Sequence, residues 1–112
     1  MKKVLFALLM LFSVTTALKA DPPKKIILTY TEEGNKLKIV ALHPVKNVTT
    51  HYIDLIAISV DGKEVKVIKP QKQSDAQAET IEVSVPQIKK GSTVSVKARC
   101  NQYGSKTADI KI

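Results

Sequence analysis

The chain has 112 residues and carries 18 basic against 10 acidic side chains, a net charge of +8, yet it contains a single arginine, Arg99, and only 4% aromatic residues. Nucleic-acid-binding surfaces usually cluster arginines and interleave aromatic side chains that stack on bases, so this composition excludes nucleic acid as an expected partner. A mild excess of dispersed lysines instead favours weak attraction of anions, such as a small anionic substrate.

The first 20 residues have the three parts of a secretory signal peptide. A pair of lysines forms a basic start, an apolar run covers Val4–Phe12, and a cleavage site follows Ala17 or Ala20. The apolar run is shorter than the roughly 20 residues that a membrane-spanning helix needs, and no second run follows it. We therefore expect one mature domain, residues 21–112, that is periplasmic or secreted and has no membrane anchor.

Beyond the signal, segments rich in Ile, Val, Leu and Thr recur at short intervals between Gly, Pro, Asn and Asp. This rhythm predicts an all-β fold, an immunoglobulin-like β-sandwich of about seven strands. Asp61-Gly62 is the strongest hairpin signal, because a type I′ turn needs positive φ at both of its central residues. The expected strands are 24–30, 35–42, 51–60, 63–69, 78–85, 92–100 and 106–112.

Apolar and polar residues alternate most clearly in the strands expected at 78–85 and 92–100. In the second of these, every other residue from Val94 to Cys100 is apolar and the residues between them are polar. We therefore expect Cys100 to face the core. The run from Tyr52 to Val60 is apolar on both faces, which predicts a central strand that is covered on both sides.

The sequence contains few candidates for a catalytic or binding site. It has no phosphate-binding glycine loop, no nucleophile elbow and no pair of closely spaced cysteines. Cys100 is the only cysteine, so the chain cannot form an internal disulfide, and a thiol outside the cytoplasm needs to be buried, bound or used. With His43 and His51, the only histidines, it could form a His₂Cys set suited to iron, copper or zinc. The alternative is that Cys100 is simply a small hydrophobic residue of a strand.

Five short segments carry a family resemblance. They are His43-Pro44-Val45, His51-Tyr52-Ile53, Asp61-Gly62-Lys63, Lys69-Pro70 and Cys100-Asn101-Gln102-Tyr103-Gly104. In order and spacing they resemble the desulfoferrodoxin, or superoxide reductase, family, whose pattern reads His-Pro-Met, a short gap, His-Tyr-Ile, a Gly-containing hairpin, and Cys-Asn-x-His-Gly. The resemblance covers about residues 24–106.

The resemblance implies an immunoglobulin-like domain that binds one non-haem ferrous iron through four equatorial histidines and an axial cysteine thiolate. The sixth position is open in that family, and superoxide is reduced there to peroxide with electrons from a donor protein. A thiolate pushes electron density onto the iron, while the imidazoles keep it ferrous. By this resemblance His43, His51 and Cys100 fall on ligand positions.

Two of the five family ligands are absent from this chain. Lys25 stands where the first histidine is expected, Tyr103 replaces the last one, and the gap between His43 and His51 is about two residues longer than usual. The standard iron centre therefore cannot form, and three interpretations stay open. Iron binds through His43, His51 and Cys100, with Tyr103 as a phenolate, or solvent, filling a position. Alternatively the same three residues bind copper or zinc, or the site is inactive and the sandwich serves as a binding module.

The third interpretation has a specific form. The longer gap between the histidines and the ending Gly104-Ser105-Lys106-Thr107 resemble the Z subunit of the thiosulfate-oxidation sulfur carrier, which binds no metal. The partner would then be a carrier protein with a cysteine on its tail, because Cys100 does not lie on a flexible glycine-flanked tail. The sequence leaves self-association into an oligomer open.

Overall fold

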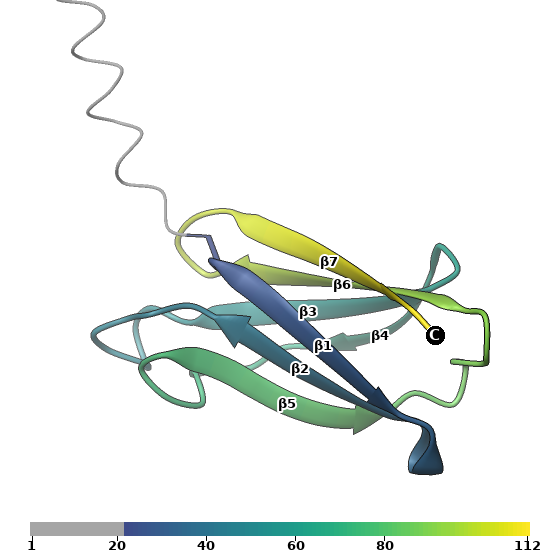
Figure 1. Cartoon of the computed structure of the whole chain (residues 1–112). Coiled ribbons are helices and arrows are strands. Elements are labelled where there is room, and N and C mark those ends of the chain that lie inside the picture. The colour runs from purple at the N-terminus through teal and green to yellow at the C-terminus, as the bar shows by residue number, and fades with distance from the viewer. Residues whose placement is uncertain (1–21) are drawn as a thin grey trace, which may run out of the picture.

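Two antiparallel β-sheets packed face to face make up the described part of the chain (Figure 1). This computed structural model describes residues 22–112, so the predicted export signal of residues 1–20, and Asp21, lie outside it. Within the described range, no helix has the length and apolar character that crossing a bilayer requires.

Seven strands form the two sheets, which confirms the predicted immunoglobulin-like sandwich, and each strand begins and ends within about two residues of its expected position. A short 3₁₀ turn, η1 (Glu33–Asn35), joins the first two strands. The three-stranded sheet has the order β1 (Lys25–Thr31), β2 (Lys36–Leu42), β5 (Ala78–Ser84), and the four-stranded sheet has the order β4 (Lys63–Ile68), β3 (Ile53–Val60), β6 (Thr93–Cys100), β7 (Ser105–Lys111).

A single apolar layer fills the space between the sheets. Inward-facing residues of β2 and β6 are buried and alternate with more exposed neighbours, as the period of two of a strand requires, and β3 adds a third row of buried residues. Cys100 continues the buried row of β6 with 4% of its surface exposed, so the prediction that it faces the core is confirmed. The residues with 0% exposure are Leu37, Ile39, Ala41, Ile53, Ile56, Ile58, Val94, Val96 and Ala98.

The expectation that the strand at 52–60 is covered on both sides is wrong. β3 is an interior strand of its sheet, but only its inner face is buried, while Leu55 and Ala57 on the other face are partly exposed. A two-layer sandwich supplies no second apolar layer to cover that face. A register shift in the pairing of β3 with β6 between Ile53 and Leu55 also breaks the alternation, which lets both Ile53 and Ile56 face inward.

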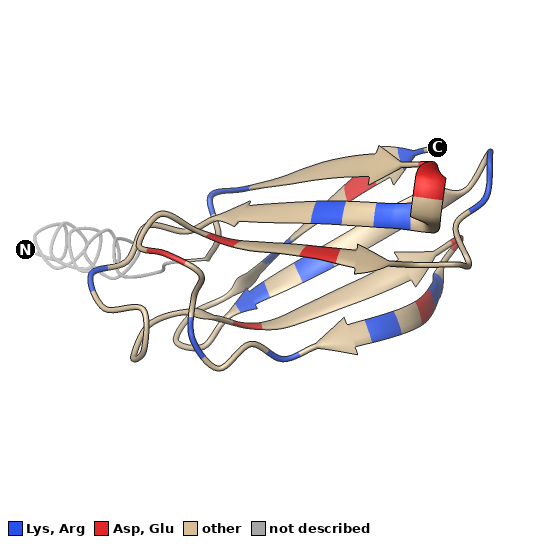
Figure 2. Cartoon of the chain, turned by 90° about the horizontal axis from the view of Figure 1, so that it is seen from below, with Lys and Arg blue, Asp and Glu red and all other residues tan. Residues whose placement is uncertain are grey.

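Charged side chains lie outside the apolar layer. Figure 2 shows lysine and arginine residues on several strands and loops rather than gathered in one patch. Arg99, the only arginine, forms a two-bond ion pair with Asp54 of the neighbouring strand, with Nε to Oδ1 at 2.9 Å and Nη2 to Oδ2 at 3.2 Å. The guanidinium group of Arg99 is therefore already paired with a carboxylate of the same sheet.

The β3–β4 hairpin has the predicted turn. Asp61 and Gly62 have φ angles of 51° and 86°, both positive, as a type I′ turn requires. Asp61 also accepts a hydrogen bond through Oδ1 from the backbone N–H of Thr93 at 3.0 Å, which ties the turn to the start of β6.

We predict that Gly62→Ala lowers the free energy of unfolding by about 1 kcal/mol, because a side chain at positive φ is strained. A Cβ at Gly62 would meet no atom within 4 Å, so the cost comes from the backbone alone. Urea unfolding measures it, with Lys63→Ala in the same hairpin as a control. Equal stability of Gly62→Ala and the parent chain would show that the turn does not hold this conformation.

Candidate metal centre

The two histidines and Cys100, which is far from both of them in the sequence, meet at one end of the sandwich. His43 follows β2, His51 precedes β3, and Cys100 ends β6, so both sheets contribute to the group. One candidate ligand atom from each of the three residues lies within 4.8 Å of the others. A nitrogen–nitrogen–sulfur set at this spacing can hold a metal ion.

The Cys100 sulfur lies in a tight loop that directs backbone N–H groups at it. Sγ accepts hydrogen bonds from the N–H groups of Gln102 at 3.3 Å and Tyr103 at 3.4 Å. The N–H of Cys100 donates to the carbonyl oxygen of Gly104 at 2.9 Å, and Gly104 has a φ of 61°, which closes the loop. Two N–H donors suit an electron-rich sulfur, which is the form that binds a metal.

His51 presents a nitrogen that lacks a protein partner. Among the described residues, its Nε2 is the buried side-chain nitrogen or oxygen without a hydrogen bond. A buried polar atom in this condition is costly, and a bound metal would satisfy it. The His51 ring packs edge-on against the His43 ring, with 4.8 Å between centroids and an interplanar angle of 89°. The orphaned nitrogen beside a second imidazole and a thiol is the observation that makes the group fit a metal.

Local hydrogen bonds fix the segment that carries His51. Oδ1 of Asn47 accepts from both the backbone N–H of Thr49 at 2.9 Å and its hydroxyl at 2.7 Å, which forms a tight Asx turn. The carbonyl oxygen of Asn47 then accepts from the N–H of His51 at 3.0 Å. The longer gap between the histidines therefore folds into a turn.

Asn101 joins the His51 segment to the Cys100 loop. Its Oδ1 accepts from the N–H of Tyr52 at 3.0 Å, and its own N–H donates to the carbonyl oxygen of Tyr52 at 2.9 Å. Its Nδ2 donates to the carbonyl oxygen of Thr50 at 3.1 Å. Asn101 thus holds the backbone on either side of His51 next to Cys100.

His43 is 2% exposed and contacts a residue that the sequence did not single out, Gln73. Its Nδ1 lies 2.8 Å from Oε1 of Gln73, which is itself 1% exposed. In the sequence, Gln73 is one glutamine in a polar loop, and nothing there marks it as a contact of His43. Its neighbours in that loop, Lys72 and Ser74, are exposed. Such a residue is ordinarily solvated, so its burial follows from the tertiary fold.

The other predicted site residues lie differently. Tyr103 is in the Cys100 loop with its backbone N–H on the sulfur, and 48% of its surface is exposed. Its role as a ligand stays a prediction. Lys25, at the position where the resemblance places a histidine, is an exposed residue that begins β1.

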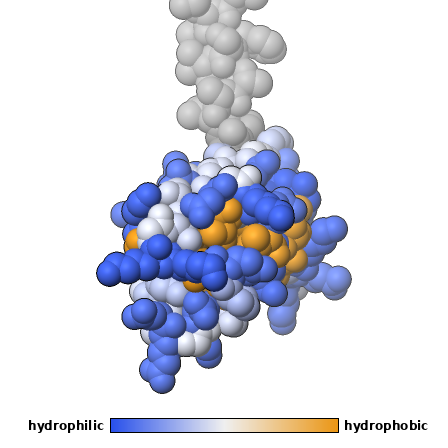
Figure 3. Space-filling view, turned by 90° about the vertical axis from the view of Figure 1, so that its right-hand side faces the viewer, coloured by the Kyte–Doolittle hydropathy of each residue, from blue (hydrophilic) through white to orange (hydrophobic). Residues whose placement is uncertain are grey.

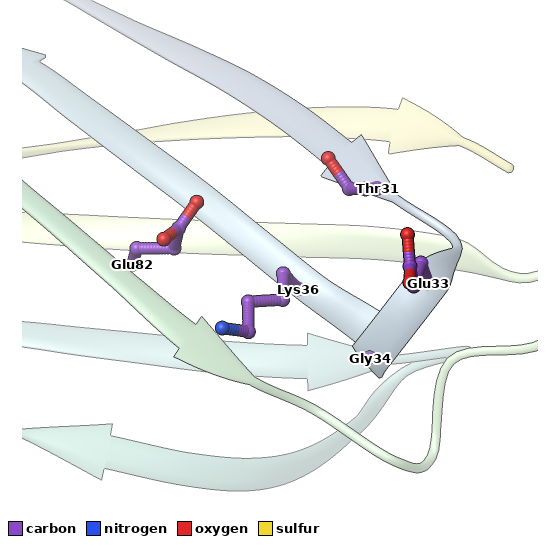
Figure 4. Close-up of a pocket in the computed structure, with 5 residues that line it drawn as sticks. All are labelled: Thr31, Glu33, Gly34, Lys36 and Glu82. Carbon is purple, nitrogen blue, oxygen red and sulfur yellow. The ribbon is translucent and has the colours of Figure 1, made fainter.

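Two shallow pockets lie at the opposite end of the sandwich, around η1 and the C-terminus. Figure 3 shows this end, where apolar side chains reach the surface within a ring of hydrophilic ones; one pocket there is lined by Tyr30, Glu32, Lys90 and Ile112. The other is shown in Figure 4 and is lined by Thr31, Glu33, Gly34, Lys36 and Glu82, all of them exposed. Neither pocket contains a histidine or cysteine, so the chemistry-bearing residues are at the other end.

No protein-family model matches this chain, and no curated protein sequence matches it either.

A buried carboxyl supports the loop that contains Gln73. Glu79 is 4% exposed, and its Oε1 accepts from the N–H of Ser74 at 2.8 Å. Burial raises the pKa of Glu79 above its ordinary value, and the hydrogen bonds from Ser74 offset part of that shift. Because the folded protein binds this proton more tightly than the unfolded chain does, this contribution to stability falls as pH rises from the unfolded pKa through the folded one.

We predict that Glu79→Gln removes this part of the pH dependence, because a neutral amide oxygen still accepts from Ser74. The free energy of unfolding of Glu79→Gln, relative to the parent chain, should increase as the pH rises from the ordinary pKa of a glutamate through the raised pKa of Glu79. Urea titrations at a series of pH values measure it, with the exposed Glu82→Gln of the same strand as control. The account of Glu79 is wrong if both variants show the same pH profile.

Proposed function

We propose that this chain is a periplasmic or secreted domain that binds one non-haem iron through His43, His51 and Cys100 and reduces superoxide to peroxide. The observation that carries the proposal is the buried, unpartnered Nε2 of His51, on a residue that offers a ring nitrogen within 4.8 Å of candidate ligand atoms of His43 and Cys100. The choice of iron and superoxide rests on the resemblance of these segments to the desulfoferrodoxin family.

The donor set supports iron through the character of its ligands. A thiolate donates electron density and imidazoles are neutral, so together they suit a divalent transition metal at low total charge. Bound there, ferrous iron would supply one electron to superoxide, which leaves as hydrogen peroxide after taking up two protons. An electron-donor protein would then return the electron. Three protein ligands leave room for Tyr103 or solvent and for a small anion.

The surroundings of the site favour an anionic substrate. A Cβ at Gly104 would lie 3.2 Å from Cβ of Pro22, so the chain enters β1 beside the Cys100 loop. Lys24 and Lys25 follow directly and are exposed. Two ammonium groups at the start of β1 raise the local concentration of a small anion such as superoxide.

We predict about one iron per chain after anaerobic purification, and loss of that iron in Cys100→Ser and His51→Ala. Each variant removes one of the three ligands, whereas the control Thr50→Ala changes the exposed neighbour of His51 and should keep the metal. Elemental analysis by mass spectrometry gives the stoichiometry. Copper or zinc at the same stoichiometry would support the metal site but contradict the choice of iron. A parent chain without metal would contradict the metal site itself.

A metal-free chain that copurifies with a protein bearing a cysteine on its tail would instead support the alternative, a binding module of a sulfur-carrier-like complex. In that case Cys100 has no role in sulfur transfer, since it is buried and hydrogen-bonded to its own loop.

We predict that the iron-loaded chain accelerates the decay of superoxide in stopped-flow mixing beyond an equal concentration of free ferrous iron. His51→Ala, mixed with an equal concentration of ferrous iron, should show only the rate of free iron because it loses a ligand. Tyr103→Phe distinguishes Tyr103 from solvent as the fourth ligand of the iron. Loss of the phenol oxygen should change the rate of superoxide decay only if Tyr103 is that ligand. Decay no faster than with free iron would exclude superoxide reduction as the function.

A further inference from the structure

The buried amide of Gln73 holds His43 from two sides. Its Oε1 lies 2.8 Å from the His43 ring nitrogen Nδ1, and its Nε2 donates to the His43 carbonyl oxygen at 2.7 Å. The same Nε2 donates to the carbonyl oxygen of Asp75 at 3.0 Å. Both protons of the amide are therefore used on backbone oxygens.

This pattern fixes which ring nitrogen of His43 carries the proton. Carbonyl oxygens can only accept, so the end of the Gln73 amide that faces two of them must be the NH₂ group. The end that faces the imidazole is then the oxygen, which also only accepts. Nδ1 of His43 must donate, and in the neutral ring Nε2 carries the lone pair that a metal ligand needs.

Gln73 also reaches the segment of the second histidine. Its backbone N–H donates to the carbonyl oxygen of Val48 at 3.0 Å, within the turn that leads to His51. One residue thus contacts His43 through its side chain and the His51 turn through its backbone. Its next neighbour, Ser74, is held in turn by the carboxylate of Glu79 at 2.8 Å.

We propose that Gln73 is the positioning residue of the metal site, which sets the tautomer of His43 so that Nε2 is the ligand atom. A hydrogen-bond acceptor on the far nitrogen of a ligating imidazole fixes the ring and increases its basicity. The metal-binding part of this inference rests on the proposed function. The tautomer part holds for the metal-free protein and is measured separately.

Long-range ¹H–¹⁵N spectra of uniformly labelled, metal-free protein test the tautomer, because protonated and bare imidazole nitrogens have well-separated shifts. In the parent chain at a pH where the ring is neutral, we expect His43 with a protonated Nδ1 and a bare Nε2. Gln73→Met, which keeps the side-chain length but removes the amide, should give a mixture of tautomers. Gln71→Met, the same change at an exposed position of the same loop, should leave the parent pattern.

A protonated Nε2 in the parent chain overturns the proposal, and this outcome does not depend on whether Gln73→Met folds. Zn²⁺ binding, measured by competition with a chromophoric chelator, tests the second part. We expect Gln73→Met to bind roughly 10- to 100-fold more weakly than the parent chain, and Gln71→Met to bind equally well. Equal affinity of Gln73→Met and the parent overturns the positioning role. If the parent binds no Zn²⁺ and contains no metal, the proposed function and the metal part of this inference fail together, while the tautomer result stands.

Discussion

The antiparallel pairing of β3 with β6 is the constraint on which the site depends. It is the central contact of the four-stranded sheet, and its last pair joins Ile53 to Cys100. The register shift beside that pair turns Ile53 and Ile56 inward together, so the apolar layer stays closed up to the end of the sheet. His51 lies two residues before Ile53, so the pairing of Ile53 with Cys100 brings His51 close to Cys100. The three-stranded sheet adds His43 directly after β2.

The end of the sandwich is stabilised by polar contacts rather than by further apolar packing. Asn101 fastens the Cys100 loop to the backbone around His51, and Gln73 fastens His43 to the turn before His51. Most of these side-chain groups use their hydrogen-bonding capacity on backbone atoms, and one candidate ligand atom each of His43, His51 and Cys100 lies within 4.8 Å of the others. Such pre-oriented ligands lower the ordering cost that metal binding would otherwise meet. The unpartnered Nε2 of His51 is the part of this arrangement that the protein itself does not satisfy.

Much of the fold could be predicted because strands leave a direct mark on the sequence. The alternation of apolar and polar residues in β6 correctly predicted that Cys100 faces the core. Asp61-Gly62 correctly predicted the turn between β3 and β4, because that turn needs positive φ at both residues. The apolar run of β3 led to the wrong prediction that this strand is covered on both sides. Apolar residues on both faces of a strand do not show how many layers pack against it. The grouping of His43, His51 and Cys100 was predicted through the family resemblance. Asn101 stood in the matched Cys-Asn segment, but its structural role was not predicted, and Gln73 was not singled out at all. Their amides donate to backbone oxygens of distant loops, and no local sequence pattern encodes such contacts.

The central claim is that His43, His51 and Cys100 bind one metal together. X-ray absorption at the edge of the metal found in the purified chain tests it most directly, because sulfur and imidazole scatterers are distinguishable there. We predict one sulfur at about 2.3 Å and at least two imidazole nitrogens at about 2.0–2.2 Å around the metal, with the sulfur absent in Cys100→Ser. A shell of oxygen and nitrogen alone in the parent chain would contradict the claim.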